Sequence, residues 1–211
     1  KTALELSNGK AVGWFQGRME FGPRALGCRS ILGDARSENM QKTLNLKVKF
    51  RESFRPFGPS VRAENISDYF DIDRESPYML LVADVNENKQ LPMTKEENSY
   101  FGLKKLNIVR SEIPAVTHVD YSARIQSVNK KTNPRYHEML TQFNEKYGCA
   151  VIVNTSFNVR GEPIVCTPGD AYLCFMRTQM DYLIIGNYLL NKVEQKNIMN
   201  EDDWMSEFKL D

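Results

Sequence analysis

The sequence predicts an α/β fold with a twisted mixed sheet flanked by helices, because strand-like and helical patterns alternate along its length. Three of the helical patterns begin with recognisable caps, and the strand patterns between the helices are short and apolar. With 211 residues, 41% hydrophobic and 26% charged, and a mean hydropathy of -0.49, the chain has the composition of one globular domain. No apolar run reaches the roughly 20 residues that a bilayer span needs.

The first third of the chain predicts two helices and two strands. They are a helix at 2–7, a strand at 11–15, a strand around 31–32 and a helix at 37–46. Asn8-Gly9 closes the first helix, and Ser37 caps the second. A glycine-rich loop, residues 17–27, lies between the two strands, and two prolines argue against a regular helix beyond Phe54.

The rest of the chain predicts six further strands and two helices. They are strands at 78–85, 115–119, 123–128, 150–153, 182–185 and 188–190, and helices at 134–147 and 168–178. Asn133 caps the first of these helices and Gly148 ends it, whereas Thr167 and Asp170 form the start signal of the second. Residues 86–106 are polar and irregular and predict a surface loop.

Positive charge is concentrated near the start of the chain, although the net charge of the whole sequence is only +1. Residues 10–62 contain 11 Lys and Arg against 4 Asp and Glu, whereas residues 63–99 contain 3 against 9. Residues 193–211, with 2 against 6, predict a solvated acidic tail or a docking segment. Because proteins that track nucleic acid usually carry a basic excess over a whole face, a compact anion is the better match.

The four cysteines predict a reduced, cytoplasmic protein, because none lies in a CxxC spacing. The two histidines lie away from the cysteines, so no structural zinc site is predicted. The first residues, from Lys1 onward, lack the features of a signal peptide. We expect the chain to have been taken from a longer polypeptide, or to be a mature form of one.

The densest cluster of basic residues is KVKFRESFRPF, at positions 47–57. If the backbone is extended there, the basic side chains project from one face and the apolar ones from the other. The basic residues are Lys47, Lys49, Arg51 and Arg55. Like charges at this spacing repel, so a bound anion is the natural compensation. The alternative is a solvated edge strand that its charges protect from aggregation.

Two more arginines occupy unusual positions. Arg24 lies in GPRALG, residues 22–27, where glycines leave a turn open to a ligand, and it predicts either a structural turn or a phosphate contact. The segment is not a Walker loop, because the GK[ST] ending is missing. Arg124 lies within an apolar strand, where a charge needs a partner, and a structural salt bridge is the alternative to a ligand contact.

A polar run, NTSFN at 154–158, directly follows an apolar strand. Open α/β sheets usually bind ligands at the carboxyl ends of strands, so these amides and hydroxyls predict contacts to phosphate or carbonyl oxygens, the alternative being a polar turn. We interpret His118 and His137 as structural, and the sequence contains no Ser-His-Asp set. Any catalysis should therefore depend on positioning and on electrostatic stabilisation of a phosphoryl or acyl-phosphate group.

Seven segments, in order, resemble the C-terminal part of the NodU-type O-carbamoyltransferases, the family of nodulation-factor and antibiotic carbamoylating enzymes. They are GRMEFGPRALGCRSIL, LNLKVKFRESFRPFGPSV, SPYM, PAVTHVDYSARIQSV, NPRYH, VNTSFNVRGEPIVCTPGDA and MDYLIIG. The resemblance extends from about Gly9 to Asn191. Two departures affect local loop geometry: Cys28 stands where a polar residue such as Asn is expected, and Ser53 replaces the usual Pro.

The resemblance implies a YrdC-like fold with a positively charged cavity, in which carbamoyl phosphate and ATP give carbamoyl adenylate and pyrophosphate. It implies catalytic roles for Lys49, Arg55 and Arg124. The residues that it implies for binding carbamoyl phosphate or the nucleotide are Arg24, Lys47, Arg51, Asn154, Ser156 and Asn158. Mg²⁺ is expected to enter with ATP, and no metal ligands are expected in this chain.

The resemblance also implies a division of labour. Residues 1–192 would form the YrdC-like domain and residues 193–211 an acidic tail, and an N-terminal actin-like domain with a His/Asp-bound iron would lie outside this chain, which has no HxxxH. Transfer to an acceptor hydroxyl would need that domain, in cis or in a partner chain. Two alternatives remain open. The first is a non-catalytic module of the same fold that binds an anion or RNA, although nucleic acid is the less favoured ligand. The second is a domain with a purely structural role that docks on another domain. No membrane partner is expected.

Overall fold

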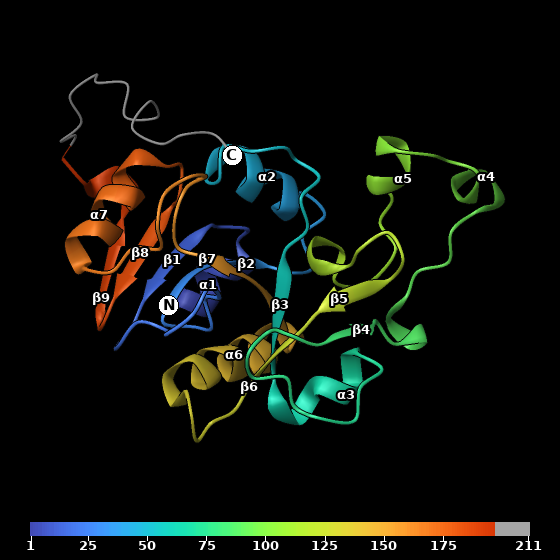
Figure 1. Cartoon of the computed structure of the whole chain (residues 1–211), viewed down its shortest axis with the longest axis horizontal. Helices are drawn as coiled ribbons and strands as arrows, with labels where there is room; N and C mark the ends of the chain where they lie inside the picture. The colour runs from blue at the N-terminus through green and yellow to red at the C-terminus, as the bar shows by residue number, and fades with distance from the viewer. Residues whose placement is uncertain (197–211) are drawn as a thin grey trace.

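A seven-stranded mixed sheet forms the centre of the molecule, which a computed structural model describes over residues 1–196 (Figure 1). Its strands, in spatial order, are β6 (Gln126–Val128), β3 (Gly58–Arg62), β7 (Val151–Ser156), β2 (Arg29–Asp34), β1 (Val12–Phe15), β8 (Tyr182–Ile185) and β9 (Tyr188–Asn191). The pairs β3/β6 and β1/β8 are parallel, and the other neighbours are antiparallel. The predicted α/β fold with a mixed sheet is confirmed.

Four helices pack on the sheet. They are α1 (Thr2–Ser7), α2 (Met40–Lys47), α6 (Pro134–Tyr147) and α7 (Pro168–Arg177). In Figure 1, α2 and α7 lie on one side of the sheet and α6 on the other, where α6 also contacts α1. Helices therefore flank the sheet as predicted, and they bury the apolar strand β7, in which Val151, Ile152 and Val153 are fully inaccessible.

The boundaries of α6 and the start of α7, which rest on local signals, are confirmed. The Asn133 side chain accepts a hydrogen bond from the Tyr136 N–H, and Gly148 ends α6 in the left-handed conformation. Thr167 and Asp170 form a capping box at the start of α7. The prediction of Ser37 as a cap is wrong: α2 begins three residues later, and its N-cap, Asn39, makes no side-chain capping bond.

Residues 63–122 form a smaller region beside the main sheet, at the right of Figure 1. It contains η1 (Ala63–Asn65), α3 (Ile66–Tyr69), β4 (Val82–Asp84), η2 (Glu87–Lys89), α4 (Lys95–Asn98), α5 (Leu103–Leu106) and η3 (Pro114–Val116). β4 pairs with β5 (Ser122–Arg124) in a separate two-stranded sheet. A last short helix, η4 (Lys192–Glu194), follows β9, and the rest of the predicted acidic tail, from residue 197 onward, lies outside the described residues.

Two predicted strands of this smaller region are wrong in extent or type. The strand expected at 78–85 is reduced to β4, because Met79 has a φ of 55° and interrupts the extended backbone. The strand expected at 115–119 begins instead as the 3-10 helix η3, with Pro114 at its first position. Among residues 1–196, no helix is long and apolar enough to cross a membrane.

The extended backbone that was considered for residues 47–57 is not formed. Helix α2 continues through Lys47, and the chain then turns, with the N–H of Lys49 bonded to the Leu44 carbonyl (2.9 Å) and the N–H of Arg51 to the Asn45 carbonyl (3.0 Å). Phe50 adopts a φ of 49°, which is rare for a bulky residue. The basic side chains therefore do not share one face of a strand.

Candidate functional site

The predicted site residues, apart from Lys47, gather at one edge of the main sheet, which we call the site edge. It consists of the C-terminal end of β7 and the N-terminal ends of β2, β3 and β6, because the register pairs Asn154 with Gly58 and Ser156 with Ser30. β6 lies parallel to β3 and begins two residues after Arg124. The topology thus brings segments from residues 24 to 158 to one place.

Arg24 and Arg124 form a pair of like charges at the site edge, which we call the arginine pair. Burial, and then the positive charge of Arg24, lower the pKa of Arg124 below its ordinary value, so the two guanidinium groups lie near each other. Neither side chain makes a hydrogen bond or an ion pair within residues 1–196, and the Nε atom of each is buried without a partner. The structural salt bridge considered for Arg124 is therefore not formed in this part of the chain.

Asn154 connects β7 to the loop that carries Arg24. Its Nδ2 donates to the Ala25 carbonyl (3.0 Å) and to Oε1 of Gln126 (2.8 Å), and Gln126 in turn donates to the Leu26 carbonyl (2.8 Å). The Oδ1 atom of Asn154 is buried and has no partner among the described residues. Asn154 therefore holds the Arg24 loop against β7 and keeps one acceptor available.

Lys49 is buried at the end of β7 and contacts two other predicted residues, Ser156 and Asn158; we call these three the lysine cluster. Its Nζ donates to Oγ of Ser156 (3.2 Å), to the carbonyl and Oδ1 of Asn158 (2.8 and 2.7 Å) and to the Ser156 carbonyl. Burial, and then the nearby charge of Arg51, lower the pKa of Lys49 to about 7. Because Ser156 and Asn154 point to the same face of β7, the cluster lies roughly 7 Å along the strand from Asn154.

Arg51 and Arg55 lie in the loop after α2, and Arg160, which follows β7, is joined to that loop by a hydrogen bond from its N–H to the Lys49 carbonyl (3.3 Å); we call these three arginines the arginine loop. Burial, followed by the charge of Arg55, lowers the pKa of Arg51 to about 10, and Arg160 adds to the effect. Glu52 binds Nε of Arg55 (3.0 Å) and lies 3.8 Å from Arg160. The carboxylate of Glu52 thus lies close to the guanidinium groups of both Arg55 and Arg160.

Lys47 does not join the others. Its side chain is exposed and lines a different cavity, with Lys10 and Asp181, at the opposite edge of the sheet. The reason is that Lys47 is the last residue of α2, whereas Lys49 follows the turn. Phe54, expected on a packed face, is 47% exposed. Among the two histidines, His137 bonds to Glu64 (2.9 Å) away from the site edge.

Two residues that sequence analysis missed position the arginines. Asn45 is fully buried, accepts from Nε of Arg51 (2.7 Å), and donates to the carbonyls of Ser53 (3.1 Å) and Arg55 (2.8 Å). Oε1 of Glu20 accepts from the backbone N–H groups of Leu26 (2.7 Å) and Cys28 (2.7 Å). Glu20 is the only acid in the loop 17–27, which could have signalled its role, whereas nothing in the sequence pairs Asn45 with Arg51.

We expect Glu20→Ala to weaken binding of inorganic phosphate by about 10-fold, because an N–H group that loses a charged acceptor costs about 1–3 kcal/mol and the Arg24 loop then loosens. Isothermal calorimetry with inorganic phosphate measures the loss. Glu20→Gln keeps an oxygen at the same position and should restore most of the affinity. Equal affinities for the wild type and Glu20→Ala would show that the loop does not depend on this carboxylate.

We expect Asn45→Leu to lower the free energy of unfolding by about 2–3 kcal/mol, because two loop carbonyls and the Nε of Arg51 lose their partner in a buried site. Urea denaturation measures this loss. The same variant should bind inorganic triphosphate more weakly than the wild type does. Unchanged triphosphate affinity in a folded Asn45→Leu protein would mean that Asn45 does not position Arg51 for a ligand.

The site edge can bind an anion but supplies few groups for proton transfer. Arginine presents a planar fork of donors to phosphate oxygens, and an arginine without a carboxylate retains that capacity. Among residues 1–196, no group of three or more His, Cys, Asp or Glu could hold a metal ion. The arrangement therefore favours binding and electrostatic stabilisation of a phosphate-bearing substrate.

The mixed α/β fold of this chain has a counterpart among solved structures. The chain is similar in fold to part of HypF, whose crystal structure is described as the full-length protein in the phosphate- and nucleotide-bound form; the TM-score is 0.56 and the identity 18%, over 88% of this chain and 24% of that one. At this identity the likeness concerns the fold.

The chain belongs to the family described as "Carbamoyltransferase C-terminus", whose model matches residues 3–192. It is 61% identical over its whole length to the uncharacterized protein sll1178 of Synechocystis, of which it covers 34%. It is 40% identical to the nodulation protein NolO of Bradyrhizobium diazoefficiens, with 89% of this chain and 31% of that protein covered.

A third relative is the 3'-hydroxymethylcephem-O-carbamoyltransferase of Streptomyces clavuligerus, 35% identical over 86% of this chain and 30% of that enzyme. The chain thus spans about a third of the length of these relatives. The resemblance to the C-terminal part of the NodU-type carbamoyltransferases is confirmed.

Proposed function

We propose that this chain is the carbamoyl-activating domain of an ATP-dependent O-carbamoyltransferase, with a YrdC-like fold and a positively charged cavity at the site edge. The observation that carries the proposal is the arginine pair, two guanidinium groups that lie near each other without a carboxylate partner among residues 1–196. Such a pair is stabilised by a dianion such as the phosphate of carbamoyl phosphate. Family membership supports the carbamoyl chemistry, and the fold likeness to HypF, whose structure is described in the phosphate- and nucleotide-bound form, supports the assignment of phosphate and nucleotide ligands.

In the proposed reaction, water cleaves carbamoyl phosphate to carbamate and inorganic phosphate. A carbamate oxygen then attacks the α-phosphorus of ATP, the bond from that phosphorus to the β-phosphate oxygen breaks, and carbamoyl adenylate and pyrophosphate are formed. Arg24 and Arg124 would bind the phosphate of carbamoyl phosphate, while the arginine loop and the lysine cluster would bind the triphosphate. Because the site edge supplies positive charge and no acid–base pair among the residues that the structure describes, its contribution would be positioning and stabilisation of negative charge.

The proposal assigns these roles to the predicted residues with one change. Lys49 makes four hydrogen bonds to Ser156 and Asn158, so it would hold the end of β7 in place and act on the substrate through them. Mg²⁺ would arrive on the ATP phosphates, since this ion needs few protein ligands there. Transfer to an acceptor hydroxyl would need the N-terminal domain with its iron, in cis or in a partner chain. The four cysteines are free, which supports a cytoplasmic location.

The proposal is tested by exchange of labelled pyrophosphate into ATP. We expect exchange that requires carbamoyl phosphate and Mg²⁺. Carbamoyl adenylate forms only when carbamoyl phosphate supplies carbamate, and the reverse of that step places labelled pyrophosphate in ATP. A protein that binds neither substrate but binds RNA, with affinity that falls steeply as salt rises, would instead be the non-catalytic module.

A further inference from the structure

A buried arginine at the start of β2 has no part in the roles assigned above. Arg29 is the first residue of β2 and is only 4% exposed. Its guanidinium carbon lies 3.5 Å from the centre of the Phe15 ring, and burial lowers the pKa of Arg29 below its ordinary value. Arg29 forms no ion pair with a carboxylate within residues 1–196. Because a buried charge without such a partner is costly, its bonds to other polar groups have to offset that cost.

The guanidinium group of Arg29 binds backbone carbonyls from two loops. Nη1 donates to the carbonyls of Gln16 (3.0 Å), Gly17 (3.1 Å) and Cys28 (3.0 Å). Nη2 donates to the carbonyls of Gly17 (3.1 Å) and Cys166 (3.2 Å). The first three carbonyls belong to the β1–β2 loop, residues 16–28, and the last belongs to the β7–α7 loop, residues 157–167. Arg29 therefore closes the first loop at both ends and joins it to the second.

The two loops that Arg29 joins carry different parts of the candidate site. The β1–β2 loop carries Arg24 of the arginine pair. The β7–α7 loop carries Asn158 of the lysine cluster and Arg160 of the arginine loop. The N–H of Arg160 in turn donates to the Lys49 carbonyl (3.3 Å), in the loop after α2. A set of hydrogen bonds and short chain segments thus connects the arginine pair to the arginine loop, and it passes through Arg29.

An arginine suits this position better than a lysine. Its planar guanidinium carries two Nη atoms, which bind different sets of carbonyls, and the Phe15 ring beneath it fixes the plane. A lysine would keep the positive charge, but all its donors would come from one nitrogen. The charge of Arg29 and its connection of the two loops can therefore be separated by one substitution.

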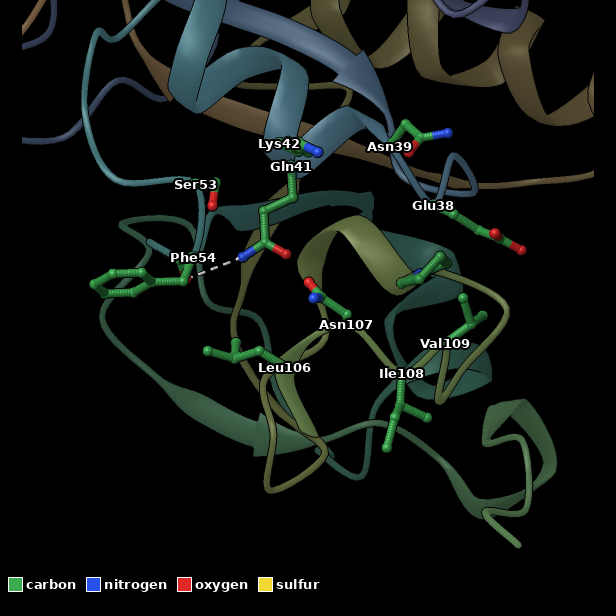
Figure 2. A pocket seen from close by; sticks show the side chains of 11 residues that line it. Glu38, Asn39, Gln41, Lys42, Ser53, Phe54, Leu106, Asn107, Ile108 and Val109 are labelled. Atoms are coloured by element: carbon green, nitrogen blue, oxygen red, sulfur yellow. Dashed lines mark hydrogen bonds between the residues drawn. The ribbon is translucent and has the colours of Figure 1, made fainter. Parts of the chain in front are cut away.

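The arginine loop has a second support, which comes from α2. Figure 2 shows Gln41 of α2 beside Phe54, and Nε2 of Gln41 donates to the carbonyls of Phe54 (3.3 Å) and Arg55 (3.2 Å). Among the described residues, Gln41 makes no hydrogen bond to the β1–β2 loop, whereas Arg29 bonds to both of the loops that it joins. Removal of each support should therefore affect anion binding differently.

We propose that Arg29 is a positioning residue that sets the arginine pair and the arginine loop relative to each other. It touches no substrate and acts through the β1–β2 loop and the β7–α7 loop. The inference rests on the proposed function, in which both groups of arginines bind phosphate oxygens, and it adds the residue that fixes their relative placement.

The test measures the affinities of the whole chain for inorganic phosphate and inorganic triphosphate by calorimetry. We expect Arg29→Lys to bind each anion about 10-fold more weakly than the wild type, because the lost bonds to carbonyls release both loops. Gln41→Leu should weaken triphosphate binding alone. Arg36→Lys is the matched control. Arg36 lies just beyond the other end of β2, donates to the Tyr147 carbonyl (2.7 Å) and lies over the Phe143 ring, and its replacement should change neither affinity.

Two further measurements make the result independent of a single variant. Phe15→Leu removes the ring under the guanidinium and keeps the charge, so it should weaken binding of both anions by about 3-fold, in the range of a cation–π contact. Hydrogen exchange without ligand should be faster in residues 17–27 and 157–166 of Arg29→Lys than in the wild type, and unchanged in α6.

The outcomes separate this inference from the proposed function. If the wild-type protein binds both anions and folded Arg29→Lys binds them equally well, or if Arg36→Lys loses as much affinity, the positioning role is wrong and the anion sites stand. Unchanged exchange in both loops of Arg29→Lys would also overturn the role. If Arg29→Lys does not fold, wild-type affinities in Phe15→Leu would overturn it. If the wild-type protein binds neither anion, the proposed function fails together with this inference.

Discussion

Replacing Arg124 by alanine should reduce the rate of carbamoyl-phosphate-dependent pyrophosphate exchange by at least about 100-fold, as the loss of one preorganised donor does in other active sites. The physical reason is that Arg124 has no carboxylate partner among residues 1–196, so its charge is available to the substrate. Its partial burial strengthens the interaction, because a charge held away from water is screened less.

Two comparisons make the Arg124 prediction specific. Arg124→Lys keeps the charge but loses the planar fork of donors, so we expect partial recovery of exchange. Arg74→Ala removes an exposed arginine that is paired with Asp73 (2.8 Å) and should leave exchange unchanged. Wild-type exchange in a folded Arg124→Ala protein would remove Arg124 from the site.

Replacing Lys49 by methionine should lower the free energy of unfolding by about 3 kcal/mol, because the carbonyls of Ser156 and Asn158 would remain buried without a donor. Urea denaturation measures the change. Lys192→Met is the matched variant: Lys192 donates to the carbonyls of Met176 (2.9 Å) and Thr178 (3.0 Å) at the end of α7, away from the site edge. Both variants should lose stability, but only Lys49→Met should also lose affinity for inorganic triphosphate.

The stability contribution of Lys49 also depends on pH. Burial lowers the pKa of Lys49 to about 7 in the folded chain from 10.5, so between these values the unfolded chain holds a proton that the folded chain has released. The free energy of unfolding should therefore rise with pH across this window, and Lys49→Met should reduce the rise. An identical pH profile in both proteins would mean that the pKa of Lys49 is not lowered.

Local signals in the sequence predicted much of the fold. The caps at Asn133 and Thr167, and Gly148 at the end of α6, act through hydrogen bonds and backbone angles within a few residues, so they can be recognised without the tertiary structure. The segment 47–57 could not be predicted in this way. The alternation of basic and apolar residues suggested a strand. In the structure the segment is a loop that side chains from α2 hold in place; for example, Asn45 donates to the carbonyls of Ser53 and Arg55.

The candidate site was predictable in composition and only partly in arrangement. Asn154 and Ser156 follow an apolar strand, a pattern that predicts a sheet edge, and Arg24 and Arg124 arrive at the same edge because β2 and β6 begin there. Their pairing depends on strand order, which the sequence does not encode locally. The exclusion of Lys47 has a different cause: Lys47 is the last residue of α2 and lies before the turn that places Lys49 at the site edge.

The central claim is that Arg24 and Arg124, a hundred residues apart in sequence, bind the same doubly charged oxyanion. A calorimetric double-mutant cycle with carbamoyl phosphate tests it most directly, using the wild type, Arg24→Ala, Arg124→Ala and the double variant. We predict that each single variant binds at least about 10-fold more weakly and that the losses deviate from additivity by about 0.5 kcal/mol or more, as for residues that share a partner. Unchanged affinity in the single variants, or losses that simply add, would contradict the claim.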